Sequence, residues 1–195
     1  MHSEWASFIN SKVSAANATV KSAEVGDSSI IVEASSILAV CEALKYGEHE
    51  FNVLQVITGC DFGEYIEVSY ILASYSKNSE LILKVKLPKT SAHAEVEIES
   101  VTSVWRAANF QERECYDMMG VRFSNHPDFR RILCPDDWVG FPLRRDYEVQ
   151  KEWQGIEVNP AHKNNTYDQQ FGAKLQADVE DPKQVSVSWK TEFGN

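Results

Sequence analysis

Apolar positions recur with helical spacing in three segments of the chain, and each segment carries a signal for its beginning or end. The first helix is predicted over residues 3–16. The second follows Ser36, a residue type that caps helix N-termini, and is stopped by Gly47. The third is predicted to begin at Ser103 and to end at Gly120, because glycine favours the left-handed backbone that closes a helix.

Runs rich in strand-forming residues predict strands around the second helix, and residues 80–87 also alternate between apolar and polar. Pro88 should end the sheet because proline cannot donate to a strand ladder, and Val96 and Ile98 are expected to add a short edge strand. The order of elements predicts an α+β fold with helices packed on one face of a mostly antiparallel mixed sheet, followed by a long extended C-terminal strap. The main strands are expected over residues 19–24, 29–33, 51–58, 65–74 and 80–87.

The periodicity disappears after Gly120. Residues 121–148 hold three of the six prolines and fit no helix or strand template, yet they are rich in aromatic and aliphatic side chains. A segment of this composition is not a disordered linker and needs a surface to lie on. We therefore expect an α/β body over residues 1–120, an extended strap over 121–148 and an extended C-terminal tail over 149–195.

Composition narrows the class of protein. The 195 residues carry a net charge of -10, which disfavours nucleic acid as a partner because phosphate binding needs a basic surface. The longest apolar run, Ile37 to Cys41, is far shorter than the roughly 20 residues of a spanning helix, and no secretory signal is expected at the N-terminus. The four cysteines include no C-x-x-C pair, so a reducing compartment is expected.

The distribution of arginine changes this picture. All seven arginines fall between residues 105 and 147, a window that holds seven acidic residues and no lysine. Arginine is preferred over lysine where a planar group must pair with a carboxylate, stack on an aromatic ring or tolerate burial. We expect buried ion pairs in this window. Arginine and aromatic residues without lysine are also typical of the core of a protein interface.

Two interpretations of this polar window remain open. His126 with Asp136 or Asp137 could serve a self-contained hydrolase, whereas the equal numbers of acids and arginines favour a structural ion-pair network. A free-standing binding module is a third hypothesis. A metal site is disfavoured because His126 has no second histidine at ligand spacing, and the kinase-like triplet Asp61-Phe62-Gly63 lacks its companion motifs. We expect no cofactor-binding or metal-ligating residue in this chain, and the resemblance described next implies that it holds no catalytic residue either.

Three stretches of this window closely resemble the signature of a known family. They read Glu112-Arg-Glu-Cys-Tyr-Asp-Met-Met-Gly-Val-Arg-Phe, then His126-Pro-Asp-Phe-Arg-Arg-Ile-Leu, then Pro135-Asp-Asp-Trp-Val-Gly-Phe-Pro-Leu-Arg-Arg-Asp-Tyr147. The family is the 30-kDa subunit of respiratory complex I, known in bacteria as the C subunit of NADH:quinone oxidoreductase. The resemblance runs from about Trp105 to Tyr147, and its departures at Cys115, Met119, Phe129 and Cys134 remove no charged residue.

The resemblance implies a cofactor-free peripheral-arm subunit of the proton-pumping NADH:quinone oxidoreductase, an enzyme only as part of that complex. Its role would be structural, packing against the 49-kDa quinone-site subunit (the D subunit) near the cluster-bearing B and I subunits. FMN, iron–sulfur clusters and quinone would belong to those partners. The chain would lie at the cytoplasmic face of the bacterial inner membrane, with only indirect membrane contact. An equivalent subunit of a ferredoxin-dependent quinone oxidoreductase or of a membrane-bound hydrogenase is the alternative.

The resemblance also marks the residues expected to form the signature and its interface. Arg130, Arg131, Arg144 and Arg145 are predicted to face carboxylates, some of which a partner chain would supply. The marked residues are Glu112, Arg113, Glu114, Asp117, His126, Arg130, Arg131, Asp137, Trp138, Arg144, Arg145 and Asp146.

Overall fold

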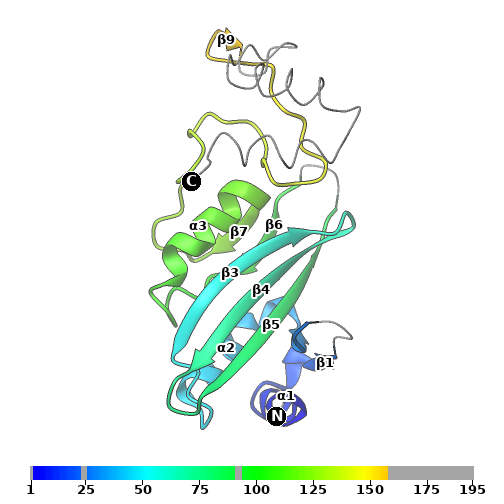
Figure 1. Cartoon of the computed structure of the whole chain (residues 1–195), viewed down its shortest axis with the longest axis vertical. Coiled ribbons are helices and arrows are strands. Elements are labelled where there is room, and N and C mark those ends of the chain that lie inside the picture. Colours follow the sequence, from blue (N-terminus) through cyan, green and yellow to red (C-terminus); the bar gives the residue numbers. More distant parts are fainter. Residues whose placement is uncertain (1, 23–25, 91–93, 158–195) are drawn as a thin grey trace, which may run out of the picture. The chain divides into compact units, whose positions relative to one another are not determined.

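A computed structural model describes residues 2–22, 26–90 and 94–157 of the chain (Figure 1). The chain divides into two compact units, Met1–Glu148 and Val149–Asn195. The first unit contains both the segment predicted as a body and the strap. Within the described residues, no helix is long and apolar enough to span a membrane.

The first unit is built on a five-stranded sheet with the strand order β1-β2-β5-β4-β3. In this sheet only the β2–β5 pairing is parallel, so it is mixed and mostly antiparallel, as the sequence predicts. The fourth strand covers the predicted residues without a shift, whereas β3 lies two or three residues later than expected. The strands are β1 (Thr19–Lys21), β2 (Ser29–Val32), β3 (Val53–Asp61), β4 (Tyr65–Ser74) and β5 (Ser79–Pro88).

Within the described residues, three α-helices accompany the sheet: α1 (His2–Lys12), α2 (Ile37–Tyr46) and α3 (Ala108–Met119). Short 3-10 turns, η1 (Ser14–Ala16) and η2 (Ala34–Ser36), adjoin the first two. The single helix predicted over residues 3–16 is therefore α1 followed by a separate turn, after which the backbone reverses at a left-handed Asn17.

Of the two predicted serine caps, Ser36 does occupy the N-cap position of α2, but its side chain is buried and makes no capping hydrogen bond. The prediction for Ser103 is wrong. The third helix begins at Ala108 rather than Ser103, because the amides of Val104 and Trp105 both bond to the carbonyl of Val101 and fold this segment into turns. The C-terminal signals hold: α2 ends at Gly47, and Gly120 ends α3 with a positive φ of 68°.

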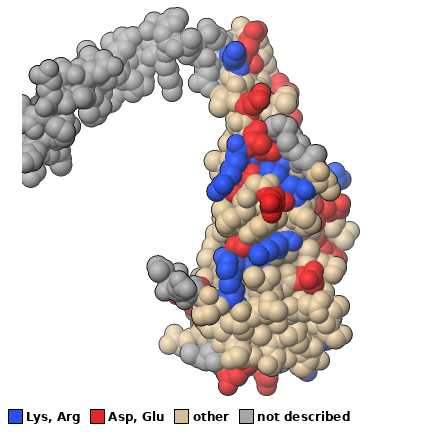
Figure 2. All heavy atoms as spheres, turned by 90° about the vertical axis from the view of Figure 1, so that its right-hand side faces the viewer, with Lys and Arg blue, Asp and Glu red and all other residues tan. Residues whose placement is uncertain are grey.

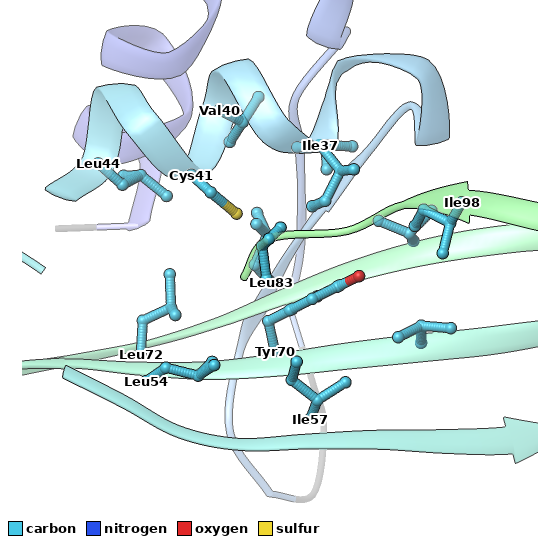
Figure 3. Packing of buried hydrophobic residues seen from close by; sticks show 14 of the residues in the cluster. Ile37, Val40, Cys41, Leu44, Leu54, Ile57, Tyr70, Leu72, Leu83 and Ile98 are labelled. Carbon is cyan, nitrogen blue, oxygen red and sulfur yellow. The ribbon is translucent and has the colours of Figure 1, made fainter. Parts of the chain in front are cut away.

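The hydrophobic core fills one face of the sheet. Alternate residues of β4 and β5, such as Tyr70 and Leu83, are fully buried there, and Figure 3 shows them pointing toward α2. The other helix of this layer, α3, runs beside the edge strand β3. Gly59 allows this approach, since a Cβ atom there would lie 3.0 Å from the Cys115 sulfur. Burial raises the pKa of Tyr70, and the nearby Cys41 on α2 and Cys115 on α3 act in the same direction.

A second, two-stranded sheet corrects the prediction for the start of the strap. Val121–Ser124 forms β7, which pairs in parallel with β6 (Val96–Glu99), and α3 connects the two strands. Val121 and Phe123 are buried and Arg122 is exposed, so the segment alternates over only four residues, too few for the pattern to stand out. The expected strand at Val96 therefore exists, but it pairs with β7 and not with the main sheet.

The remainder of the strap, from Asn125 to Glu148, contains no helix or strand, as its lack of periodicity predicts, and consists of turns and bends; its extended path stays a prediction. The described start of the tail forms a small antiparallel hairpin, β8 (Glu152–Trp153) and β9 (Ile156–Glu157), around left-handed Gln154 and Gly155. The rest of the tail lies outside the described residues, so the extended tail stays a prediction.

Candidate functional site

Asp117 is the centre of the contacts between α3 and the strap. Its side chain is fully buried, and its Oδ2 atom accepts hydrogen bonds from three consecutive strap amides, those of Ile132 (3.0 Å), Leu133 (2.6 Å) and Cys134 (2.9 Å). Burial acts to raise the pKa of Asp117, but these amides and Arg131 outweigh it, so the pKa lies below its usual value. One ionised carboxylate thus fixes a loop that has no regular structure.

Arg131 supplies the positive charge beside Asp117. Its Nη1 atom lies 2.7 Å from Asp117 Oδ1, and its Nη2 atom donates to the carbonyl of Gly140 at 3.1 Å. The guanidinium also lies over the rings of Tyr116 and Phe141, at 5.8 and 5.3 Å from their centroids. The structure therefore contains the kind of buried, stacked ion pair that the arginine pattern predicts.

A second cluster ties the first half of α3 to the beginning of the strap. Arg113 is buried, its Nε donates to the carbonyl of Arg130 at 3.1 Å, and its Nη1 lies 3.4 Å from Asp128 Oδ2. Arg130 pairs with the same aspartate at 3.0 Å, but that pair is exposed to solvent. Arg113 and Asp117 share a helix face, yet each pairs with the strap.

Glu112 and His126 form a third contact, with both side chains fully buried. Glu112 accepts hydrogen bonds from Ser100 Oγ (2.6 Å) and the Val101 amide (2.8 Å). One ring nitrogen of His126 bonds to the Asn109 carbonyl at 3.1 Å and the other accepts from the amide of Asp128 at 3.0 Å. Both ring nitrogens are thus bonded to backbone groups.

Within this chain Arg144 binds backbone carbonyls, and its predicted pairing with a carboxylate stays a prediction. Its Nε donates to the carbonyl of Met119 at 2.6 Å and its Nη2 donates to that of Gly120 at 3.3 Å. The buried guanidinium therefore caps the C-terminus of α3, where backbone carbonyls lack helical partners and the helix dipole attracts positive charge. It stacks on Phe141, 4.8 Å from the ring centroid, and burial lowers its pKa.

Sequence reasoning missed a further cluster that holds the end of the strap. Asp61, at the end of β3, is buried and pairs with the equally buried Lys89, whose Nζ atom lies 3.1 Å from Asp61 Oδ2 and 3.4 Å from Asp146 Oδ2. The amides of Gly63 and Arg145 also donate to Asp61. Burial acts against ionisation of Asp61, but these donors keep its pKa below its usual value.

With this geometry in place, the chain can be compared with known proteins. Residues 30–153 match the family described as "Respiratory-chain NADH dehydrogenase, 30 Kd subunit". The chain belongs to this family. The match begins inside β2 and ends in β8, so it includes α3 and the whole strap.

Two relatives show how this 30-kDa subunit family member compares with known subunits. The C subunit of the NADH-quinone oxidoreductase of Moorella thermoacetica is 44% identical over 125 residues, which cover 63% of this chain and 81% of that protein. The C/D subunit of the NADH-quinone oxidoreductase of Phocaeicola vulgatus is 40% identical over 106 residues, covering 54% of this chain and 20% of that protein.

A chain in the structure of the membrane-bound sulfane sulfur reductase, an archaeal respiratory membrane complex, has the same fold. It aligns with a TM-score of 0.62 at 21% identity, covering 83% of this chain and 96% of that one. At this identity the likeness concerns the fold alone. The α+β body of the 30-kDa subunit family member is thus shared with a subunit of another respiratory complex.

The strap of this family member exposes three large aliphatic side chains among its charged ones. Leu133, Val139 and Leu143 expose 62%, 72% and 65% of their surface, whereas the side chains of Asp117, Arg131 and Arg144 are largely buried. Charges that do reach the surface are mixed: in the view of Figure 2, basic side chains lie beside acidic ones. Of the other marked residues, Glu114, Asp137 and Arg145 are exposed and Trp138 is half-buried.

The hydrolase and metal hypotheses find no support in these contacts. A general base needs a ring nitrogen that can reach substrate, and His126 has both nitrogens bonded to backbone groups inside the protein. Asp136 and Asp137 lie on the exposed side of the strap. Over residues 2–22, 26–90 and 94–157, no group of three or more acidic, histidine or cysteine side chains is arranged to hold a metal.

Proposed function

We propose that this chain is the C subunit of a proton-pumping NADH:quinone oxidoreductase and that its role in the complex is to bind and hold a neighbouring subunit. One observation carries the proposal. The strap is fixed from within by Asp117, Arg131 and Arg144, while Leu133, Val139 and Leu143 face solvent. A rigid irregular segment that presents large apolar side chains is typical of a protein-binding surface.

The 49-kDa quinone-site subunit, the D subunit of the complex, is the partner that we propose for this surface. Support comes from the Phocaeicola vulgatus relative, whose name joins C and D and of which this chain matches only one fifth. Two modules within one polypeptide meet at high effective concentration, which suits subunits that bind each other. Contact with the cluster-bearing B and I subunits would follow from the same position in the complex.

The chemistry of the complex is then carried by the partners. FMN, iron–sulfur clusters and quinone are proposed to bind to other subunits, and this chain to bind none of them. Its proposed location is the cytoplasmic face of the inner membrane, where it would be held through those subunits. The contribution of the chain to catalysis is therefore the correct assembly of the peripheral arm.

The test introduces negative charge at the exposed aliphatic residues of the strap. Replacing Leu133 and Leu143 together by glutamate should leave the fold intact, because both side chains are largely exposed, and should remove the subunit from the NADH-oxidising assembly by burying two charges at the interface. The measurement is co-purification after mild detergent extraction of membranes, with quinone reduction by NADH assayed on the same material.

The matched control is Tyr75→Glu in the turn between β4 and β5, where an aromatic side chain is 75% exposed far along the sequence from the strap. This variant should assemble normally. Normal assembly and activity of the Leu133/Leu143 double variant would overturn the proposed surface. The assembly purified with the unsubstituted chain also tests the electron donor. If it does not oxidise NADH but reduces quinone with ferredoxin, or evolves hydrogen, the chain belongs to the alternative complex and not to an NADH:quinone oxidoreductase.

A further inference from the structure

Two fully buried carboxyl groups, those of Asp117 and Glu112, lie on α3, and they differ in whether a basic side chain pairs with them. Asp117 has Arg131 at 2.7 Å. Glu112, five positions earlier, has no lysine or arginine among the ion pairs of the described residues, and the basic group that lies near it is the His126 ring, with Nε2 3.9 Å from Oε2. A buried carboxylate without a paired cation is costly, and such a group binds a proton instead.

His126 does not act as that cation. Its Nδ1 atom accepts a hydrogen bond from the amide of Asp128, so this nitrogen carries no proton, and the single ring proton lies on Nε2 toward the carbonyl of Asn109. A second proton on the ring would break the bond to Asp128. Burial lowers the pKa of His126, and the charge of Arg113 lowers it further, against the raising effects of Asn109 and Asp128. The ring is therefore neutral at neutral pH.

The other titratable groups that face Glu112 are neutral acids. They are Cys41 on α2, Tyr70 on β4 and Cys115 on α3. Burial raises the pKa of all three, that of Cys115 to about 12, and the Tyr70 hydroxyl has no hydrogen-bond partner among the described residues. None of them supplies a positive charge. Glu112 is left with the Ser100 hydroxyl and the Val101 amide, which only partly offset the effect of burial, and its pKa rises to about 7.

We propose that Glu112 and His126 form a buried proton-binding site that couples pH near neutrality to how firmly the start of the strap is held against α3. The protonated acid is the closed form. It sits against Ser100 and Val101 without a net charge, and His126 stays bonded to Asp128. Loss of the proton leaves a buried negative charge beside a neutral ring, which favours opening of this contact. The inference concerns only this chain and goes beyond its proposed place in the complex.

The sign of the effect follows from linkage. The pKa of Glu112 is raised by folding from 4.5 to about 7, so the closed form binds more protons than the open form between these values. The stabilisation of the closed form by the Glu112 proton is fully present below pH 4.5. It declines as pH rises from 4.5 to about 7 and is lost above that. Between pH 5.5 and 8 the opening equilibrium should rise on the order of 20-fold.

The first test uses the full, unsubstituted chain. Carboxyl carbon NMR of glutamate-labelled protein should show one carboxyl, assigned to Glu112, that titrates with a midpoint near pH 7. The His126 ring should keep its proton on Nε2 throughout that titration. A midpoint for Glu112 below pH 5, or a His126 ring that gains a second proton together with the ionisation of Glu112, would overturn the proposal.

The second test asks whether the proton acts on the strap. Amide hydrogen exchange at Asp128 and Val101 is compared at pH 8 in the full chain and in Glu112→Gln, which keeps the shape of the side chain without its charge. Exchange should be slower in Glu112→Gln by on the order of 10- to 100-fold. The control is Glu114→Gln, an exposed position on the same helix, which should exchange like the unsubstituted chain. Equal exchange in all three proteins would show that the proton is not coupled to the strap.

Discussion

Asp117 stays ionised inside the protein because four donors surround it, three amides of the strap and one guanidinium. Each donor comes from a segment with no helix or strand of its own. The carboxylate accepts hydrogen bonds from the consecutive amides of residues 132–134, which would otherwise be unpaired. In a sheet, a neighbouring strand accepts such bonds. A single side chain replaces regular secondary structure at this place.

Asp117→Asn should lower the free energy of unfolding by about 3 kcal/mol at pH 7, because it leaves Arg131 without its buried partner. Urea unfolding checks this value, with the exposed Asp136→Asn as a control that should change little. The pKa of Asp117 is lowered by folding, so its stabilisation is present above the ordinary value of 3.8 and disappears as pH falls through the lower folded value. Asp117→Asn should flatten this acid part of the stability curve.

The sequence predicts some of these contacts and not others, for a physical reason. Equal numbers of acids and arginines in one window predict pairs such as Asp117 with Arg131. The pattern does not predict that Arg144 also bonds to the carbonyls that end α3. Every residue has a backbone carbonyl. A side chain that bonds to a carbonyl therefore requires no particular residue type as its partner, and the sequence does not reveal the contact.

Gly120 joins two elements, since it ends α3 and begins the turn into β7. Its φ of 68° is one that side chains other than glycine rarely adopt. A Cβ atom there would also lie 2.5 Å from the Phe141 ring and 2.7 Å from Arg144 Nη2. The C-terminal end of the helix and the packing of the strap therefore depend on the same missing side chain.

Gly120→Ala should lower the free energy of unfolding by about 2–4 kcal/mol, from backbone strain together with displacement of Phe141. The control is Gly63→Ala, where φ is +91° and nothing lies within 4 Å of the added Cβ, so only the backbone term remains. Thermal and urea unfolding of both variants separates the two contributions. Equal losses in the two would mean that the ring does not pack against Gly120 as described.

Elements are predicted well where the pattern is local. The fourth strand, a continuous ten-residue run rich in strand-forming residues, has the predicted bounds, and α3 ends where its glycine indicates. The strand β7 escapes prediction because Val121 and Phe123 are only two apolar positions, and their partner strand lies on the far side of α3 in the sequence. A short strand that pairs across a helix has neither length nor a hairpin turn to identify it.

At the scale of the whole first unit, Lys89 joins three distant parts of the chain: the end of β5, the end of β3 and the end of the strap. Lys89→Met should lower the free energy of unfolding by about 3 kcal/mol, since Asp61 would keep only its amide donors. Urea unfolding tests this, and Lys77→Met in the exposed turn before β5 is the control that should be nearly silent. A silent Lys89→Met would contradict the role given to the buried pair.

The fold class and the family can be recognised from the sequence because both rest on patterns that lie close together along the chain. Asp61 stands in a kinase-like triplet without companion motifs, and its partners outside that triplet lie 28 and 84 residues further on. Contacts at such distances connect residue types that are common everywhere in the chain. Only the folded structure brings them into one cluster.

The bond from the Arg145 amide to Asp61 has a consequence for the timing of synthesis. The two residues are 84 positions apart. A ribosome adds about 5–20 residues per second, so about 4–17 seconds pass between the appearance of Asp61 and that of its last donor. During this interval the sheet can form, but Asp61 at the end of β3 lacks the hydrogen bond from Arg145, because that part of the strap has not been synthesised. A nascent chain that stalls before residue 145 would therefore present this edge, incomplete, to the chaperones and proteases around the ribosome.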